Sequence, residues 1–425
     1  MTQVAPQLND IANGSKNRLF PKDEAAHRWY RFVLSFPPQL VREYIDRFHL
    51  TRKSLVLDPF CGTGTTLVEA KKQGVRSVGL EAHPMPAFAS GVKTEWSPDP
   101  RGLLEHAGRV AAKVGKGLAS GTETLRSLPP ETDKLLLKGS IGPLPLHKTL
   151  ALLDELRGEA SSLYYKHERL SLANALVQDI GNLHFGPEVG VSKKKKDDAP
   201  VVASWLSNVR TMAEDLEELR GKQHVPSTVW CHDSRHMLEL IPDGSVDGVI
   251  TSPPYPNEKD YTRTTRLESV ILGLIHDRKG LRRLKQGLLR SNTRNVYKDD
   301  RDDRWIEGFP KIKKIAEQIE RRRIALGKTS GFERLYARVT KLYFGGMAQH
   351  LSVLRRALRP GARLAYVVGD QASFLRVMIR TGQLLGEIAE SLGYEVEALD
   401  LFRTRFSTTT KEQLREEVLV LRWPG

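Results

Sequence analysis

The chain has 425 residues, of which 40% are hydrophobic and 28% are charged, so it is long enough to bury the core of one catalytic domain with insertions. Its formal net charge of +15 favours a polyanionic partner, and its only two cysteines, Cys61 and Cys231, exclude a disulfide framework or a cysteine-rich zinc site. It has neither a leader-like N-terminus nor an apolar run of about 18 residues, so we expect a cytoplasmic protein with no membrane partner.

The first segment of the chain, residues 1–26, is polar and is expected to form a flexible N-terminus. Aromatic residues at helical spacing follow, and they fit a core better than a base-stacking platform. The two prolines after Phe36 then interrupt the chain, and the pattern predicts a helix over residues 38–48.

A short apolar strand is predicted over residues 55–58, and it leads through a turn containing Gly62 and Gly64 into a helix. Glycines let the backbone approach a ligand closely, and a helix N-terminus offers free N–H groups. The next strand, residues 77–81, ends in Glu81, which is placed to accept both hydroxyls of a ribose. Position 67 is Leu where a dinucleotide fingerprint has its third glycine. A nucleoside without a pyrophosphate therefore fits better than NAD, and an ordinary α/β turn is the alternative.

Residues 97–227 have apolar residues at helical spacing, interrupted by proline-rich turns, and predict a helical insertion. The lysine run at 193–196 could touch phosphate, although a solvated loop explains it better. The insertion could serve as a target-recognition region, as a dimer interface or as a platform for another subunit.

A second strand-to-loop junction carries the most informative pattern, Thr251-Ser252-Pro253-Pro254-Tyr255, after a strand predicted over residues 246–250. Two successive prolines remove two backbone donors and stop the strand. The turn that remains suits a flat ring with an amine, because Ser252 and the Pro253 carbonyl can accept from the NH₂ group while Tyr255 stacks on the ring. Taken alone, a Pro-Pro-Tyr sequence is more often a simple loop.

The region after this turn is strongly basic. Residues 278–323 hold 16 Lys and Arg against 7 Asp and Glu, a net charge of +9. Such a patch would bind phosphates without reading sequence, and a pair of helices with charged outer faces is the alternative. The candidate nucleic-acid contacts are Arg263, Arg266, Asn292, Arg294 and Lys298. Tyr297 or Trp305 could fill the gap left by an extruded base.

Two of these segments together resemble the signature motifs of amino-group DNA methyltransferases that use S-adenosyl-L-methionine. They are Asp58-Pro59-Phe60-Cys61-Gly62-Thr63-Gly64 and Thr251-Ser252-Pro253-Pro254-Tyr255. Phe36 and Pro37 are similar to the segment that touches the methionine part of the cofactor, and Asp233 and Ser234 lie where the family has its adenine-contacting acid. Residues 366–370 and 416–421 resemble its later strands. The resemblance covers roughly residues 27–92, 228–268 and 340–425.

The resemblance implies an α/β fold, a Rossmann-like methyltransferase domain with a mostly parallel, doubly wound sheet, plus a large helical insertion and a basic helical insertion. We expect a flexible N-terminus at 1–26 and three catalytic parts at 27–96, 228–268 and 340–425. The helical insertion would occupy 97–227, and the basic insertion, the candidate target-DNA recognition segment, 269–339.

The implied activity is methyl transfer from S-adenosyl-L-methionine to the exocyclic amine of a base flipped out of double-stranded DNA. Ser252, Pro253, Pro254 and Tyr255 would form the catalytic turn, and no metal is expected. Serine at the first motif position favours N4 of cytosine over N6 of adenine. An RNA base methyltransferase, a non-catalytic DNA-binding subunit and a nucleotide-dependent oxidoreductase are the other classes considered, and a restriction or defence-system partner is left open.

Overall fold

The computed structural model describes residues 19–30, 36–121, 124–185, 188–257, 259–406 and 412–425. Most of the expected flexible N-terminus, residues 1–18, therefore lies outside the described residues.

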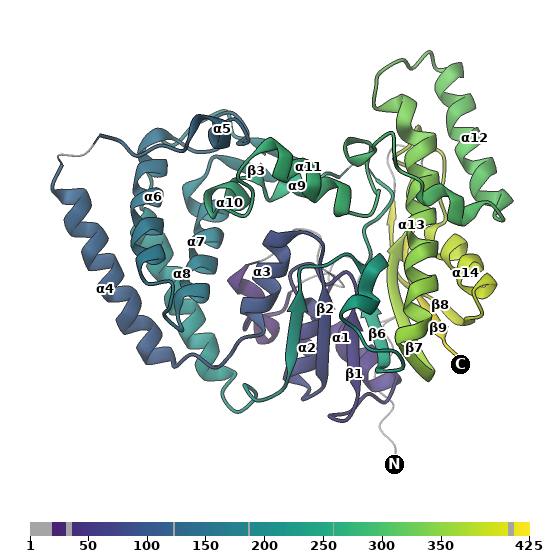
Figure 1. Cartoon of the computed structure of the whole chain (residues 1–425), viewed down its shortest axis with the longest axis horizontal. Helices are drawn as coiled ribbons and strands as arrows, with labels where there is room; N and C mark the ends of the chain where they lie inside the picture. Colours follow the sequence, from purple (N-terminus) through teal and green to yellow (C-terminus); the bar gives the residue numbers. More distant parts are fainter. Residues whose placement is uncertain (1–18, 31–35, 122–123, 186–187, 258, 407–411) are drawn as a thin grey trace.

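A seven-stranded sheet in the order β5-β2-β1-β6-β7-β9-β8 forms the centre of the catalytic part (Figure 1). Its strands are β1 (Leu55–Asp58), β2 (Arg76–Leu80), β5 (Ser227–Trp230), β6 (Val246–Thr251), β7 (Leu358–Gly369), β8 (Glu395–Phe406) and β9 (Gln413–Arg422). All pairings are parallel except those of β9 with β7 and β8. This mostly parallel arrangement confirms the α/β, Rossmann-like fold predicted from the sequence.

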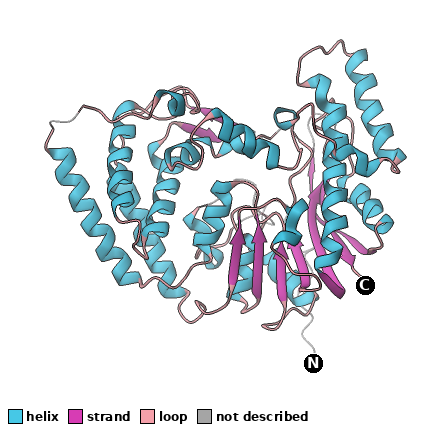
Figure 2. Cartoon of the chain, in the orientation of Figure 1, coloured by secondary structure: helices cyan, strands magenta, loops and turns pink. Residues whose placement is uncertain are grey.

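Helices cover both faces of the sheet, because successive residues at the end of β7 are buried alternately in two different cores. Ala365 and Val367 pack with α1 (Pro38–Arg47) and α2 (Thr65–Lys72) in one core, whereas Leu364, Tyr366 and Val368 pack with α13 (Tyr336–Ala357) and α14 (Thr381–Ser391) in another. Successive side chains of a strand point to opposite faces, so a strand buried on both sides needs an apolar residue at nearly every position. Figure 2 shows the helices on the two sides of the strands.

Two strands of the sheet, β5 and β8, were not predicted from the sequence. β5 is an edge strand whose side chains are half-buried or exposed and do not make an apolar run, and β8 is a long edge strand with charged residues facing solvent. β7 is longer than the predicted 366–370 because it begins at Leu358, before Pro360 and Gly361, and it ends at Gly369. Edge strands carry such polar residues commonly, which weakens their periodic signal.

The helical insertion is built from long helices and a small hairpin. Its elements are α4 (Pro100–Ala119), α5 (Pro130–Asp133), α6 (Pro143–Gly158), α7 (Tyr165–Ala175), η4 (Leu176–Ile180), β3 (Leu183–Phe185), β4 (Val189–Val191) and α8 (Val201–Glu218). Its apolar core continues into α3 (Pro84–Lys93) and into Trp29 and Tyr30 near the N-terminus. Asp215 on α8 accepts from Trp29 Nε1 at 2.8 Å and from the Ala26 amide at 3.0 Å, so polar contacts reinforce the same junction.

The segment between β6 and α13 crosses above the sheet and includes a projecting helix, α12 (Figure 1). Its elements are α9 (Tyr261–Thr264), α10 (Arg266–Ile271), α11 (Arg278–Gly287), η6 (Thr293–Asn295), η7 (Asp302–Ile306), α12 (Pro310–Ala325) and η8 (Glu333–Leu335). Short 3-10 helices η2 (Pro21–Asp23), η3 (His27–Trp29) and η5 (Ser234–Glu239) complete the described chain. None of the helices described has a stretch both long and apolar enough to span a bilayer.

Candidate functional site

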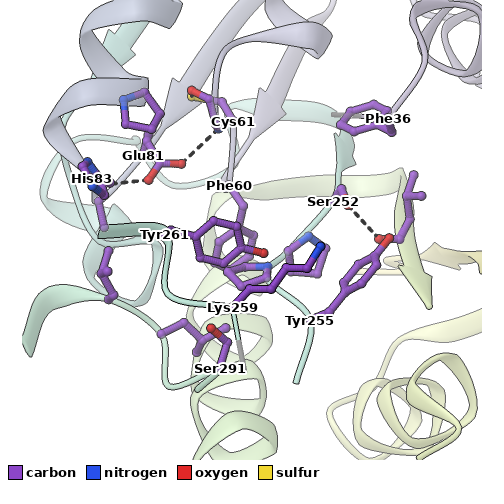
Figure 3. A pocket seen from close by; sticks show the side chains of 18 of the residues that line it. Phe36, Phe60, Cys61, Glu81, His83, Ser252, Tyr255, Lys259, Tyr261 and Ser291 are labelled. Carbon is purple, nitrogen blue, oxygen red and sulfur yellow. Dashed lines mark hydrogen bonds between the residues drawn. The ribbon is translucent and has the colours of Figure 1, made fainter. Parts of the chain in front are cut away.

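Two loops almost two hundred residues apart in the sequence line one cavity of about 510 Å³ (Figure 3). The glycine turn follows β1, and the double-proline turn follows β6. These two strands are parallel neighbours, so their carboxyl ends open on the same edge of the sheet. The spatial relationship expected from the two motifs is therefore present.

The glycine turn owes its shape to Gly64, whose φ is +84° and which precedes α2. A Cβ at this position would come within 2.4 Å of Ser90 Oγ, so no other residue fits without a shift of α3. The turn presents Phe60 and Gly62 to the cavity, and the Phe60 ring rests edge-on against His350 at a centroid distance of 4.8 Å.

Glu81, which follows β2, lies across the cavity from the double-proline turn (Figure 3). Its carboxylate accepts from the Gly62 amide at 3.0 Å and from the His83 amide at 2.8 Å. Burial raises the pKa of Glu81 to about 7, and these two amides only partly oppose that shift. The side chain is therefore a fixed acceptor whose charge changes near neutral pH.

Asp58 lies beneath the cavity and ties the two loops together. It is fully buried, and its Oδ1 accepts from Thr251 Oγ1 at 2.6 Å and from the Phe60 amide at 3.2 Å. Burial raises the pKa of Asp58 to about 6 against the opposing hydrogen bonds from Thr251 and Thr66. Its Oδ2 atom is buried and has no partner among the described residues. Asp58 does not line the cavity, so it supports the cofactor turn from below.

At the double-proline turn, Ser252, Pro253, Pro254 and Tyr255 all line the cavity. The Ser252 hydroxyl donates to the Val367 carbonyl at 3.1 Å, which orients its oxygen lone pairs for a second partner. The ring of Tyr255 lies against Gly369, and burial raises the pKa of its phenol.

Asp233 and Ser234 line the cavity at the start of η5. The Asp233 carboxylate accepts from Arg235 Nη2 at 2.6 Å, and Arg235 also donates to Asp302 at 2.6 Å. Burial alone would raise the pKa of Asp233, but the hydrogen bonds and charge of Arg235 outweigh it and lower the pKa. Oδ1 also accepts from the Arg235 amide at 3.0 Å, and Arg235 Nε lies 3.1 Å from Oδ1 and 3.0 Å from Oδ2, so a ligand donor would share this carboxylate with Arg235.

Most of the predicted cofactor and catalytic residues face the same space. The residues that line the cavity are Phe36, Pro59, Phe60, Gly62, Glu81, Asp233, Ser234, Ser252, Pro253, Pro254 and Tyr255. Pro37 and Gly64 shape the chain beside it without lining it, since Pro37 is the residue before α1 and Gly64 the residue before α2.

The predicted nucleic-acid contacts divide into structural and exposed residues. Asn292 is fully buried, its Oδ1 accepting from the Arg294 amide and its Nδ2 donating to the Lys259 carbonyl, so it holds a loop rather than reading a base. Arg266 is tied to Thr262 and to the Leu135 carbonyl and likewise acts as a structural brace.

The remaining candidates are less enclosed. Arg294 stands between Glu188 and the Phe332 ring, whereas Arg263 is half-buried and Lys298 is exposed. Of the two aromatic residues considered for filling a vacated base position, Trp305 packs against the core and Tyr297 lies between Arg282 and Arg290. Neither ring projects freely.

Sequence reasoning missed several cavity residues. They are His83, His232, Lys259, Tyr261, Ser291, Gln371, Ser373, Phe402, Arg403 and Glu416 among others. Tyr261 lies six positions after Tyr255, outside the five-residue motif. Phe402, Arg403 and Glu416 sit on antiparallel strands far from either motif; no sequence signal marked the first two, and Glu416 was recognised only as part of a strand. Among the described residues, no group of three His, Cys, Asp or Glu side chains could hold a metal ion.

Comparison with known sequences agrees with this geometry. A family model described as DNA methylase matches residues 9–85, which include the glycine turn and Glu81. The Type II methyltransferase M.BsoBI of Geobacillus stearothermophilus is 27% identical over 409 residues, covering 88% of this chain and 79% of that protein. The chain is similar in sequence to amino-group DNA methyltransferases.

A second relative of this methyltransferase group covers nearly the whole molecule. The Type II methyltransferase M.AvaI of Anabaena variabilis is 22% identical over 460 residues, covering 95% of this chain and 87% of that protein. The similarity to this protein therefore extends well beyond the two motifs. A solved structure, TrmN from Thermus thermophilus, is 13% identical with a TM-score of 0.30, covering 94% of this chain and 52% of that chain.

Proposed function

We propose that the protein transfers a methyl group from S-adenosyl-L-methionine to the exocyclic amine of a base flipped out of double-stranded DNA, most readily N4 of cytosine. The observation that supports this proposal is the shared cavity, with the glycine turn and Glu81 at one end and Ser252 and Tyr255 at the other. The names of the relatives, Type II methyltransferases, support DNA as the substrate.

The glycine-turn end of the cavity has the chemistry to hold the methyl donor. Glu81 would accept hydrogen bonds from the ribose hydroxyls, and Asp233 from the adenine amine. Phe36, Phe60 and Gly62 would enclose the amino-acid portion. Asp58 would keep the turn in place through its bonds to Thr251 and Phe60. When bound, S-adenosyl-L-methionine supplies an electrophilic methyl carbon.

The double-proline end prepares the nucleophile. The lone pair of an exocyclic amine is delocalised into the base ring, so the amine attacks poorly. Ser252 Oγ and the Pro253 carbonyl would accept its two hydrogens and favour a pyramidal nitrogen whose lone pair is available. Since the nitrogen loses its proton only after it has become cationic, no strong base is required. Catalysis is then mostly the positioning of two bound partners.

Base flipping is required because the amine is paired inside a duplex, and it costs roughly a few kcal/mol. Stacking on Tyr255 would offset this cost, by about 1–3 kcal/mol if it resembles stacking in single-strand binders.

DNA would approach over α11, which carries Arg278, Lys279, Arg282 and Arg283, all exposed. None of these four pairs with a carboxylate among the described residues, and the helix leads directly to Leu288 and Leu289 at the cavity. Phosphate contacts from this helix would place the duplex without reading its sequence. We also propose DNA contacts for three other residues, Lys298, Arg294 and Arg263. The boundaries predicted from the sequence for the catalytic parts and the two insertions belong to the same proposal.

A transfer assay tests the function. The purified full chain is incubated with tritium-labelled S-adenosyl-L-methionine and either plasmid DNA or bulk RNA, and the nucleosides are then separated after digestion. We expect label in N4-methylcytosine from DNA. Label in N6-methyladenine would correct the base, and label confined to RNA would overturn the DNA assignment.

A matched pair of variants separates chemistry from folding. Ser252→Ala should keep cofactor binding and lose most of the transfer, whereas Ser245→Ala, which removes a loop hydroxyl that donates to the Pro242 carbonyl, should keep both. Parental transfer by Ser252→Ala would contradict the role given to the double-proline turn. Protection of DNA in expressing cells from an endonuclease that cuts the same sequence would support a restriction partner.

A further inference from the structure

A charged pair that neither motif includes lies at the double-proline end of the cavity. Arg403 on β8 donates from Nε to Glu416 Oε2 at 2.6 Å and from Nη2 to Glu416 Oε1 at 2.9 Å, and both residues line the cavity. The two residues are directly opposed in the β8–β9 pairing. The guanidinium is thus held in one orientation by two parallel hydrogen bonds.

The pair lies in a row of residues that runs across neighbouring strands to Tyr255. Gly369 on β7 is opposed to Glu416 on β9, which is opposed to Arg403 on β8. A Cβ at Gly369 would touch both Tyr255 Cε2, at 3.2 Å, and Glu416 Cγ, at 3.4 Å. The ring proposed to stack on the target base therefore has the ion pair as its immediate neighbour.

Glu416 engages only one side of the guanidinium. Its bonds use Nε and one N–H of Nη2, and among the residues that the structure describes Nη1 of Arg403 has no hydrogen-bond partner. Arginine cannot be deprotonated and carries no acceptor, so this free side is purely a donor fork. The Arg403 side chain is 23% exposed and the Glu416 side chain 15% exposed, so the fork is largely desolvated and still open to the cavity.

We propose that Arg403 reads the target base by donating to N3 and O2 of an extruded cytosine, while Glu416 fixes its orientation. This inference rests on the proposed function and identifies the base on which it acts. It assigns Arg403 to specificity, beside the catalytic turn that contacts the amine.

The two candidate bases differ at the edge that such a fork would meet. Next to the amine-bearing carbon, cytosine has the acceptor N3 and then the acceptor O2. Adenine has the acceptor N1 and then a C–H group. A fork aimed at this edge satisfies two acceptors on cytosine but leaves one donor facing a C–H on adenine. A buried donor without a partner disfavours the wrong base by about 10- to 100-fold.

A functional-group substitution measures the contact. Once the methylated sequence is known, two duplexes are compared, one with cytosine at the target and one with 3-deazacytosine, which keeps the amine and O2 but lacks the N3 acceptor. The ratio of their kcat/KM values is measured for the parent chain and for the double variant Arg403→Met with Glu416→Gln. The double variant avoids leaving one charge buried alone.

The matched control removes another cross-strand ion pair from the same two strands. Arg422 and Glu395 pair at 2.8 Å at the opposite, exposed end of β8 and β9, away from the cavity. The double variant Arg422→Met with Glu395→Gln should therefore retain parental transfer and parental discrimination. It reports on any general weakening of the hairpin.

The expected result is that the parent prefers cytosine to 3-deazacytosine by about 10- to 100-fold. The Arg403 and Glu416 double variant should lose transfer to cytosine by a similar factor and treat the two duplexes alike, with cofactor affinity unchanged. Parental discrimination in that variant, or methylation of adenine by the parent, would overturn the inference while leaving DNA methylation intact. A parent chain that methylates no DNA would overturn the proposed function itself.

Discussion

The ring of Tyr255 lies against Gly369, and a Cβ on that glycine would stand 3.2 Å from Tyr255 Cε2. The packing fixes the depth at which the ring sits beside Ser252. We predict that Gly369→Val displaces the ring and lowers kcat of methyl transfer by about tenfold or more, while the cofactor dissociation constant stays within about twofold. Steady-state kinetics and calorimetry measure the two quantities.

The control for this change is Gly115→Ala on α4, where a Cβ would meet open space. It should leave kcat unchanged and raise stability by about 0.5–1 kcal/mol. An unchanged kcat in Gly369→Val would show that the position of the Tyr255 ring does not limit the reaction.

Replacement of Tyr255 itself separates its ring from its hydroxyl. Tyr255→Phe keeps a stacking face, whereas Tyr255→Ala loses about 1–3 kcal/mol of stacking and should lower kcat/KM on DNA by about 5- to 150-fold. Cofactor binding should persist in both variants. Similar losses in the two variants would point to the phenol hydroxyl, and no loss in Tyr255→Ala would exclude stacking on this ring.

Cofactor affinity should depend on pH through Glu81. Burial raises the pKa of Glu81 to about 7, so the carboxylate that would accept from a ribose is mostly protonated at pH 6 and mostly ionised at pH 8. The dissociation constant for S-adenosylhomocysteine should therefore fall by about tenfold over this range. Glu81→Gln should bind more weakly and show no such dependence, and a parent chain with pH-independent binding would contradict this role for Glu81.

Stability should respond to pH through Glu268, which is buried and accepts from the Tyr30 hydroxyl. Burial raises its pKa to about 7 in the folded chain, whereas in the unfolded chain it titrates near its ordinary value of 4.5. The folded state then binds more protons, so stability falls as pH rises from 4.5 to 7. Glu268→Gln removes this loss and should gain up to about 3 kcal/mol relative to the parent at about pH 8 compared with about pH 4.5.

Urea unfolding of both proteins at about pH 4.5 and about pH 8 measures this difference. The amide oxygen of Gln can still accept from Tyr30, so the packing is preserved. A constant difference between variant and parent at the two pH values would show that Glu268 is ionised in the folded chain at both.

DNA affinity should depend on α11 more than on paired cations elsewhere. Replacing Arg278 and Arg283 by Gln should weaken binding across unrelated sequences and lower the salt dependence of log K by about 0.9 for each phosphate that is no longer neutralised. Lys311→Gln on α12 is the control, since Lys311 already pairs with Glu387 at 2.6 Å. Equal effects of the two changes, measured by fluorescence anisotropy at several salt concentrations, would argue against α11 as the phosphate-binding element.

The cofactor half of the site could be predicted because its physical requirements are local. A strand end, Gly64 in a left-handed conformation and the acid Glu81 two elements later lie within about thirty residues and leave a readable pattern. The strand over 55–58 and the turn before α2 were therefore predicted correctly. The pairing of β1 with β6 needed only the knowledge that the two motifs share one sheet.

Some cavity residues could not be predicted from a local sequence pattern, because they come together only when distant strands pair. Arg403 and Glu416 become neighbours only through the register of two antiparallel strands, one of which, β8, was not predicted at all. Asn292 was wrongly predicted to contact DNA, because it is a polar residue in a basic segment. In the structure its side-chain amide makes hydrogen bonds that hold a loop. Burial of a polar side chain cannot be recognised from composition.

The continuous apolar core that joins α3, Trp29 and the helices of the insertion has a consequence for protein engineering. A chimaera that exchanged only residues 97–227 for the equivalent block of a related enzyme would leave Met85, Ala89 and Trp29 facing a foreign surface. Such a graft would have to carry α3 and the segment around Trp29 with it. The helices of residues 97–227, α3 and the residues around Trp29 share one apolar core, so they would have to be transplanted together.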